Sequence, residues 1–200
     1  MNSLKTKKYF ETIKSIDANI YNIAYHQKRY ESVLKSFGFS EFKNLAQYLN
    51  PPMAGIYRCK LIYDETSIKV TYHKYKKRDI KTLKIVHNDD IEYCKKSTSR
   101  EELDAMFEKR KDCDDVLIIK NSLITDTTIA NVAFCKNGLW YTPKKPLLEG
   151  TTRARLLDEK KIIQKDIRVQ DLNEYSHIAL MNAMIDFDII TKYNLKDIIC

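Results

Sequence analysis

The spacing of apolar residues changes at Gly55, and this change limits the possible folds more than any other feature. Before Gly55, apolar side chains recur at the three-to-four-residue interval of a helix. After it, residues 56–63 and 68–72 alternate between apolar and polar around Asp64 and Glu65, which is typical of two antiparallel strands joined as a hairpin. The chain is therefore predicted to be a mixed α/β (α+β) protein.

Two helices are predicted ahead of this hairpin. Residues 21–36 have helical apolar spacing and are followed by Gly38, a stop signal. A second, shorter helix is predicted over 41–49. Pro51 and Pro52 end it, because neither ring can donate to a helix hydrogen bond.

The second half is predicted to combine helices with short strands. Ser99 followed by Glu102 is a capping-box pattern, which predicts a helix starting just after Lys96. Asn137-Gly138 predicts a tight hairpin turn. The other apolar runs predict strands over 116–119, 132–135, 139–141 and 177–181, and a helix over 151–161.

These elements predict two lobes. Residues 1–90 are expected to form an N-terminal α/β lobe, and residues 91–200 a mainly β C-terminal lobe with one prominent helix. Small-molecule sites most often lie between lobes. A cleft between these lobes is therefore the expected place for a small-molecule site.

Composition excludes several classes of protein. Of 200 residues, 44% are hydrophobic, which is enough to build a core and excludes disorder. No stretch approaches the roughly 20 apolar residues of a spanning helix, and residues 1–9 lack the apolar segment of a signal peptide. A cytoplasmic location is expected.

Five cysteines without a CxxC or a nearby His pair indicate neither a disulfide framework nor a zinc site.

The chain carries a large net positive charge. The formal net charge is +8, and six basic residues with one acid lie between Lys74 and Lys84. Such a run is most often a solvated face, and attraction of an anionic ligand or nucleic acid is the second interpretation. Thirteen tyrosines among the lysines keep a non-catalytic nucleic-acid-binding protein as an alternative, although no RNP-like, KH-like or helix-turn-helix pattern is present.

Three segments carry groups suited to chemistry: Lys96-Ser-Thr-Ser-Arg100, Thr125-Asp-Thr-Thr-Ile-Ala-Asn131 and Thr142-Pro-Lys-Lys-Pro-Leu-Leu-Glu-Gly-Thr-Thr-Arg153. In this order and spacing they resemble the class IV family of pyridoxal-phosphate enzymes, the branched-chain and D-amino-acid aminotransferase type, which also contains 4-amino-4-deoxychorismate lyase. Further matches are Phe10-Glu-Thr-Ile, His26-x-x-Arg29 and Asn182-Ala183. The resemblance covers nearly the whole chain and implies the two-lobed fold of that family.

One segment of the family pattern has no counterpart. The family usually opens with a strand pair and an Asp-Arg-Gly…Gly-Asp-Gly segment before the Phe-Glu-Thr, and this chain begins after that point. A trimmed N-terminal lobe is therefore expected. Because that region helps to line the substrate pocket and the subunit contact in relatives, altered specificity is one expectation and a cofactor-free relic of the family is another.

The resemblance implies pyridoxal 5'-phosphate as cofactor, which needs a lysine amine, an acid for its ring nitrogen and a phosphate cradle. Lys96 is implied as the catalytic Schiff-base lysine, and its neighbour Lys95 is a competitor that only the spacing to Arg100 disfavours. Asp126 takes the position of the acid that pairs with the ring nitrogen. Most of the family has Glu there, so this side chain reaches about one methylene less far.

The phosphate is implied to bind at the start of the helix after residue 150, where unpaired backbone N–H groups face an anion. An arginine on the first helix is implied to contact the same phosphate. A loop near the end of the chain is implied to lie beside the cofactor. The implied binding residues, besides the acid, are Arg29, Asn131, Gly150, Thr151, Thr152, Asn182 and Ala183.

Two reactions are compatible with these groups, and in both the freed lysine removes a proton as general base. Reprotonation at the cofactor gives amino transfer, whereas loss of a β-substituent gives elimination, which in the lyase releases pyruvate and leaves 4-aminobenzoate for folate biosynthesis. The short chain, without an obvious long loop for an aliphatic pocket, favours the lyase. A class IV amino-acid aminotransferase is the alternative.

The expected partner is a small amino substrate that carries carboxylates. Arginine forks pair with carboxylates, so the basic residues Arg58, Lys60, Lys76 and Arg78 favour a doubly carboxylated substrate. The resemblance also implies a homodimer.

Overall fold

The chain forms two compact units. The computed structural model describes residues 7–191 and 198–199. The first unit takes the residues up to Lys76 together with Lys95–Ser99, and the second takes Lys77–Cys94 together with the residues from Arg100 onward. The chain thus returns to the first unit for one short segment before it enters the second unit again.

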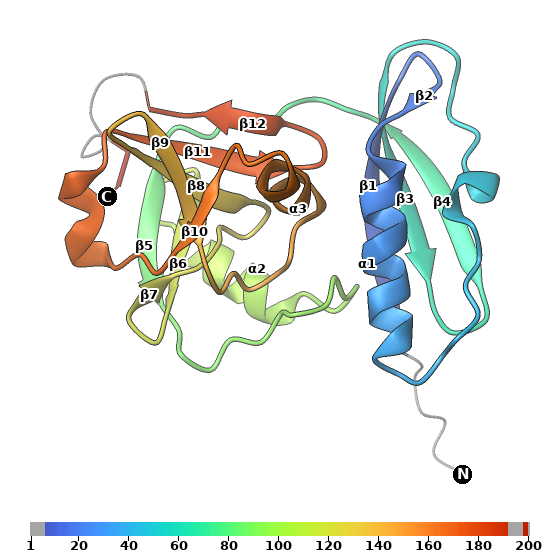
Figure 1. The fold of residues 1–200 in the computed structure, drawn as a ribbon, viewed down its shortest axis with the longest axis horizontal. Coiled ribbons are helices and arrows are strands. Elements are labelled where there is room, and N and C mark those ends of the chain that lie inside the picture. Colours follow the sequence, from blue (N-terminus) through green and yellow to red (C-terminus); the bar gives the residue numbers. More distant parts are fainter. Residues whose placement is uncertain (1–6, 192–197, 200) are drawn as a thin grey trace. The chain divides into compact units, whose positions relative to one another are not determined.

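The first unit is a four-stranded antiparallel sheet in the order β2-β1-β3-β4, with a helix lying along it (Figure 1). Strands β1 and β3 pair along their whole length, and β3 and β4 form the hairpin that the alternating pattern predicted. The elements are β1 (Tyr9–Ile16), β2 (Asn19–Ile20), α1 (Ile23–Lys35), the 3₁₀ helix η1 (Leu45–Tyr48), β3 (Ile56–Tyr63) and β4 (Ile68–Lys74).

Strand alternation gives this sheet two different faces. On the face toward α1, Ile13 and Leu61 are fully buried and pack with Tyr30 and Leu34 of the helix. Glu11 lies on the same face, since it is separated from Ile13 by one residue and contacts side chains of α1. The opposite face carries the intervening residues, which are more exposed.

The second unit holds two further sheets. A five-stranded sheet has the order β10-β9-β8-β11-β12, and a three-stranded sheet has the order β5-β6-β7. Their interior sides form one apolar cluster around Leu117, Phe134 and Ile178. The strands are β5 (Leu83–His87), β6 (Asp115–Lys120), β7 (Leu123–Ile124), β8 (Asn131–Lys136), β9 (Leu139–Pro143), β10 (Ile163–Lys165), β11 (His177–Asn182) and β12 (Asp186–Ile189).

Three helical segments complete this unit: α2 (Glu101–Glu108), α3 (Thr151–Asp158) and the 3₁₀ helix η2 (Val169–Glu174). Leu156 of α3 packs in an apolar cluster with Ala133 and Met181 of the five-stranded sheet. Helix α3 is therefore held against the sheet (Figure 1).

The predicted mixed α/β fold is confirmed, and most predicted elements are present. Helix α1 lies within the predicted range, and strands β6, β8, β9 and β11 contain the predicted runs. Asn137 and Gly138 have φ angles of 53° and 77° between two antiparallel strands, as the predicted tight turn requires.

Several local predictions were wrong. Only η1 forms within residues 41–49, where Asn44 caps a single 3₁₀ turn. The capping box at Ser99 does not form, because Arg100 is the N-cap and the Glu102 carboxylate accepts a hydrogen bond from the Glu92 backbone instead. Helix α3 stops at Asp158, short of the predicted end.

Not all of the cysteines are free thiols. Cys59, Cys94 and Cys135 are free thiols, but Cys113 is disulfide-bonded, which the sequence did not predict. Within the described ranges, no helix has the length and apolar character needed to cross a membrane.

Candidate active site

A short segment around Lys96 joins the first unit as an added strand. The Phe10 backbone N–H donates to the Lys96 carbonyl at 2.9 Å, and the Thr98 N–H donates to the Lys8 carbonyl at 2.9 Å. Tyr9 and Ser97 are directly opposite in this antiparallel pairing. Lys96 is therefore fixed beside the first residues of β1.

This pairing separates the two candidate lysines. Directly opposite residues share a face of a sheet, and successive residues alternate between faces. Lys96 lies opposite Phe10, and its Nζ is 4.7 Å from the centroid of that ring. The Lys95 Nζ instead lies 5.3 Å from the ring of Phe37, which packs against Tyr9. The two lysines thus project to opposite faces.

Arg29 belongs to a buried ionic cluster on the α1 side of β1. Its Nε and Nη2 donate to the two carboxylate oxygens of Glu11 at 2.8 and 2.6 Å. The Nδ1 of His26 lies 2.6 Å from the same carboxylate, and both Glu11 and His26 are fully buried. The His26-x-x-Arg29 spacing places both side chains on one side of α1, against a single strand residue.

Burial and neighbouring charges together determine the protonation states of Glu11 and His26. Burial opposes ionisation of Glu11, but the charge of Arg29 and the hydrogen bonds from His26 and Arg29 outweigh it and lower its pKa to about 2. Burial lowers the pKa of His26 against the effect of Glu11. The imidazole is therefore neutral, with Nδ1–H donating to an ionised Glu11.

In the second unit, Asp126 is held by two neighbouring segments. Its Oδ1 accepts from the Asn131 side-chain amide at 2.8 Å, and its Oδ2 accepts from the Leu148 N–H at 2.9 Å. Asn131 also donates to the Leu148 carbonyl at 2.8 Å. In the part of the chain that the structure describes, this buried acid forms no ion pair.

Burial controls the ionisation of Asp126. Loss of hydration raises its pKa to about 7, although the hydrogen bonds from Leu148 and Asn131 and the charge of Arg153 act in the opposite direction. A cation close to this carboxylate would lower the pKa again. The chemistry of the donor set therefore suits a cationic ring nitrogen as an additional partner.

Gly150 brings the start of α3 into contact with the same network. A Cβ at Gly150 would lie 1.9 Å from the Asn131 Oδ1, so only glycine permits this approach. Thr151 and Thr152, the first residues of α3, are buried at 5% and 3% exposure. Unpaired N–H groups and the positive end of the helix dipole occur at such a start, and both favour a phosphate.

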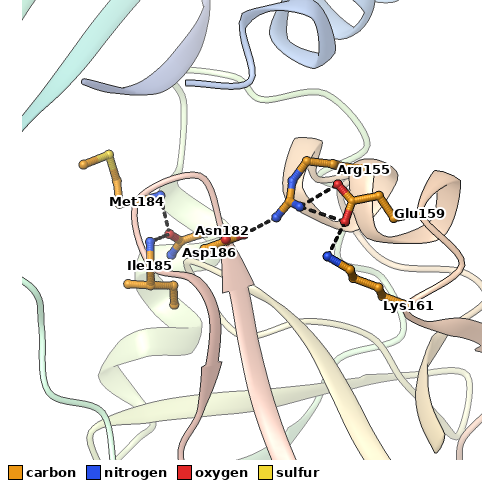
Figure 2. Close-up of polar contacts among 7 residues, drawn as sticks. All are labelled: Arg155, Glu159, Lys161, Asn182, Met184, Ile185 and Asp186. Carbon is orange, nitrogen blue, oxygen red and sulfur yellow. Dashed lines mark hydrogen bonds and ion pairs between the residues drawn. The ribbon is translucent and has the colours of Figure 1, made fainter. Parts of the chain in front are cut away.

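Asn182 is the last residue of β11, and Ala183 begins the turn that follows it. The Asn182 Oδ1 accepts from the backbone N–H groups of Met184 and Ile185 at 2.9 and 3.1 Å, which orders this turn (Figure 2). Its side-chain amide donates to the Ile129 carbonyl at 3.3 Å. The turn is thereby tied to the loop that leads from Asp126 to β8.

The predicted site residues are distributed over both units. Lys96 and Arg29 belong to the first, and the others belong to the second. The structure brings Asp126, Asn131 and Gly150 into one network, but it pairs Arg29 with an acid to which the sequence assigned no role. No local sequence pattern indicated this role of Glu11, because its partners His26 and Arg29 lie in the following helix.

The residues present fit pyridoxal phosphate. The start of α3 has backbone N–H groups that lack helical partners, and Gly150 ahead of them carries no side chain. Asp126 is a buried acid without an ion-pair partner among the described residues. Lys96 supplies an amine on the less buried face of its sheet.

Comparison with known proteins identifies the family. The model of the amino-transferase class IV family matches residues 68–193, and the chain belongs to that family. A crystal structure of "a putative 4-amino-4-deoxychorismate lyase" from Haemophilus somnus 129PT is 35% identical, with a TM-score of 0.83 over 92% of this chain and 98% of that chain. The fold is thus that of a class IV aminotransferase.

Two other relatives extend this result. An uncharacterized protein of Haemophilus influenzae is 36% identical over 181 residues, which are 88% of this chain and 96% of that protein. The pyridoxal-phosphate-bound form of a hypothetical aminotransferase from Mycobacterium tuberculosis has a TM-score of 0.77 over 93% of this chain and 81% of that chain, at 17% identity. The second similarity concerns the fold alone.

Glu11→Gln should destabilise the protein by about 3–5 kcal/mol, because it leaves Arg29 and His26 beside a neutral group in a buried site. Since the pKa of Glu11 is lowered to about 2, its stabilising contribution is present above about pH 4.5 and is lost as the pH falls toward 2. Urea unfolding at several pH values measures both effects. Glu31→Gln, at the more exposed Glu31–Lys35 pair of α1, is the control and should change stability by less than about 1 kcal/mol.

Asp126 should make the protein less stable as the pH rises. Its folded-state pKa of about 7 lies above the ordinary value of 3.8, so its contribution is complete below about pH 4 and is lost as the pH rises through 7. The loss corresponds to about 4 kcal/mol. Unfolding free energies from pH 4 to 8 should lose this slope in Asp126→Asn and retain it in Asp166→Asn, at an exposed position. An unchanged slope in Asp126→Asn would contradict the assignment.

Proposed function

We propose that this protein is a pyridoxal-phosphate-dependent 4-amino-4-deoxychorismate lyase. The observation that carries the proposal is the position of the Lys96 Nζ, 4.7 Å from the Phe10 ring and on the face of β1 opposite to Glu11. This lysine has the family spacing to Arg100, and its neighbour Lys95 projects to the other face. Membership of the class IV family supports the same conclusion.

Each candidate residue has a distinct role in this proposal. When bound, pyridoxal phosphate supplies an electron sink that stabilises a carbanion next to the substrate nitrogen. Lys96 holds the cofactor through its amine and, once released, takes the proton from that carbon. Asp126 supplies a negative charge for the ring nitrogen, and the N–H groups at Thr151 and Thr152 bind the phosphate.

The remaining residues position these groups. Asn131 and Gly150 connect the acid to the start of α3, and Asn182 with Ala183 forms the turn beside the cofactor. Arg29 contributes positive charge for the phosphate, although Glu11 neutralises much of it. We therefore expect the helix start to contribute more to phosphate binding than Arg29 does.

Elimination is favoured over amino transfer for two reasons. The similar Haemophilus somnus protein, described as a putative lyase, is matched over 98% of its length. The face of the sheet that carries Lys96 is also rich in cations, which suits a substrate with two carboxylates. A class IV aminotransferase is the second candidate, because the same lysine and acid serve both reactions.

We also propose that the protein acts as a homodimer, as the family resemblance implies. Light scattering of the purified full chain at micromolar concentration measures its mass directly. A monomeric mass at all concentrations would reject this part of the proposal.

Lys96→Ala should abolish the visible absorbance that appears when the purified protein is mixed with pyridoxal phosphate, because the amine that binds the cofactor is lost. Lys95→Ala is the matched control and should retain the absorbance. Borohydride reduction followed by peptide mapping should place the adduct on the peptide that contains Lys96. An adduct on Lys95 or on any other lysine would refute the assignment.

Incubation with aminodeoxychorismate should release pyruvate continuously without an added 2-oxo acid. The proton leaves the carbon next to the nitrogen, the bond from the ring to the ether oxygen breaks, and pyruvate departs as the ring becomes aromatic. Elimination leaves no amino group to be passed on, so turnover would need no acceptor. An aminotransferase would stop after one turnover until an acceptor was supplied, so steady amino exchange with 2-oxoglutarate and no pyruvate would support the second candidate.

A further inference from the structure

The face of the first-unit sheet that points away from α1 is strongly cationic. Lys14 of β1 lies directly opposite Arg58 of β3, and Arg58 lies directly opposite His73 of β4. Lys60 is the next residue of β3 on this face and is flanked by Thr12 and Thr71. None of the residues that β1, β3 and β4 contribute to this face is acidic.

Like charges directly opposite each other destabilise a sheet. Lys14 and Arg58 nevertheless occupy such a pair, and within the described residues no ion pair involves Lys14, Arg58 or Lys60. The basic run from Lys74 onward is different. Lys77 pairs with Asp188 at 2.7 Å and Lys81 pairs with Asp79 at 2.8 Å, so part of that charge is neutralised internally. The sheet face, by contrast, has no such ion pair at Lys14, Arg58 or Lys60 within the described residues.

This cationic face is continuous with the candidate catalytic lysine. The Nζ atoms of Lys60 and Lys96 lie 5.3 and 4.7 Å from the centroid of the same ring, that of Phe10. Thr12 follows Phe10 on this face and lies opposite Lys60. A molecule whose nitrogen reaches Lys96 would therefore extend its acidic groups along β3 toward Arg58.

We infer that Lys60 and Arg58, with Lys14 opposite, bind the two carboxylates of a dicarboxylated amino substrate and select it over monocarboxylates. The inference rests on the proposed amino-substrate chemistry at Lys96 and adds the residues that determine specificity. Lys60 and Arg58 are two residues apart, which separates their Cα atoms by roughly 7 Å along the strand. Two carboxylates of one small ring fit this separation. Thr12 and Thr71 add hydroxyl donors beside Lys60.

The test uses isophthalate as a dicarboxylate probe and benzoate as its monocarboxylate counterpart. Neither has an amine, so their binding to the full chain, with and without pyridoxal phosphate, is independent of catalysis. Calorimetry should show that isophthalate binds at least tenfold more tightly than benzoate. Arg58→Gln and Lys60→Gln should each weaken isophthalate binding about ten- to a hundredfold, the range for a lost hydrogen bond to a charged group.

Lys74→Gln is the matched control. Lys74 lies in the same sheet, opposite Tyr57, which belongs to the other face, and it is exposed. The substitution removes the same charge and should leave isophthalate affinity within twofold. An equal loss in Lys74→Gln would indicate a net-charge effect and would overturn the inference. Unchanged affinity in Arg58→Gln and Lys60→Gln would overturn it as well.

Two further outcomes separate this inference from the proposed function. In the first, the protein releases pyruvate while Arg58→Gln and Lys60→Gln leave the KM for aminodeoxychorismate unchanged. That result would support the proposed lyase reaction and refute the assignment of these two residues to specificity. If isophthalate binds as expected but no pyruvate is released, the dicarboxylate site stands and the proposed reaction fails. Displacement of isophthalate by a single-stranded oligonucleotide that loses affinity in the same variants would instead assign the face to nucleic acid and overturn the inference.

Discussion

The backbone pairing between the Lys96 segment and the start of β1 decides which lysine lies on which face of the sheet, and the proposed chemistry depends on it. The Phe10 N–H and the Thr98 N–H fix its register, and the Thr98 hydroxyl adds a bond to the Lys8 carbonyl at 3.1 Å. A slip of one residue would exchange the faces of every side chain. Lys95 would then lie beside Phe10 and Lys96 beside Phe37. Under the proposed function, the choice between Lys95 and Lys96 is therefore a consequence of register more than of side-chain chemistry.

The face of β1 toward α1 carries a buried charge that has to be stabilised. Glu11 is a fully buried acid inside an otherwise apolar layer, and a buried charge is tolerated only when it is paired and hydrogen-bonded. Arg29 supplies the charge in a two-bond contact, and His26 supplies a third hydrogen bond. Because both come from α1, the cluster also fixes the helix against β1. The His26-x-x-Arg29 motif is thus structural in its direct contacts.

The sequence predicted the elements whose signals are local. The β3–β4 hairpin, α1 and the Asn137-Gly138 turn depend on alternation, helical spacing and positive φ angles, all of which are visible in neighbouring residues. Strand β1 was not predicted, because Glu11 occupies an inward position and breaks the apolar alternation. The capping box failed for a similar reason, since Glu102 was bound instead by the backbone of Glu92, ten residues away. In both cases the acidic side chain is bound by groups that lie far from it in the sequence, which a local pattern does not reveal.

Asp126 illustrates how a substitution within a motif is accommodated by its surroundings. A shorter acid than the family's usual Glu has less freedom to adjust, and here the Asn131 amide and the Leu148 N–H hold both of its oxygens. The same Asn131 lies against Gly150, where a Cβ would be 1.9 Å from its Oδ1. The acid and the start of α3 are therefore connected through one amide side chain. Because this side chain contacts both of them, a shift of either one would move the other.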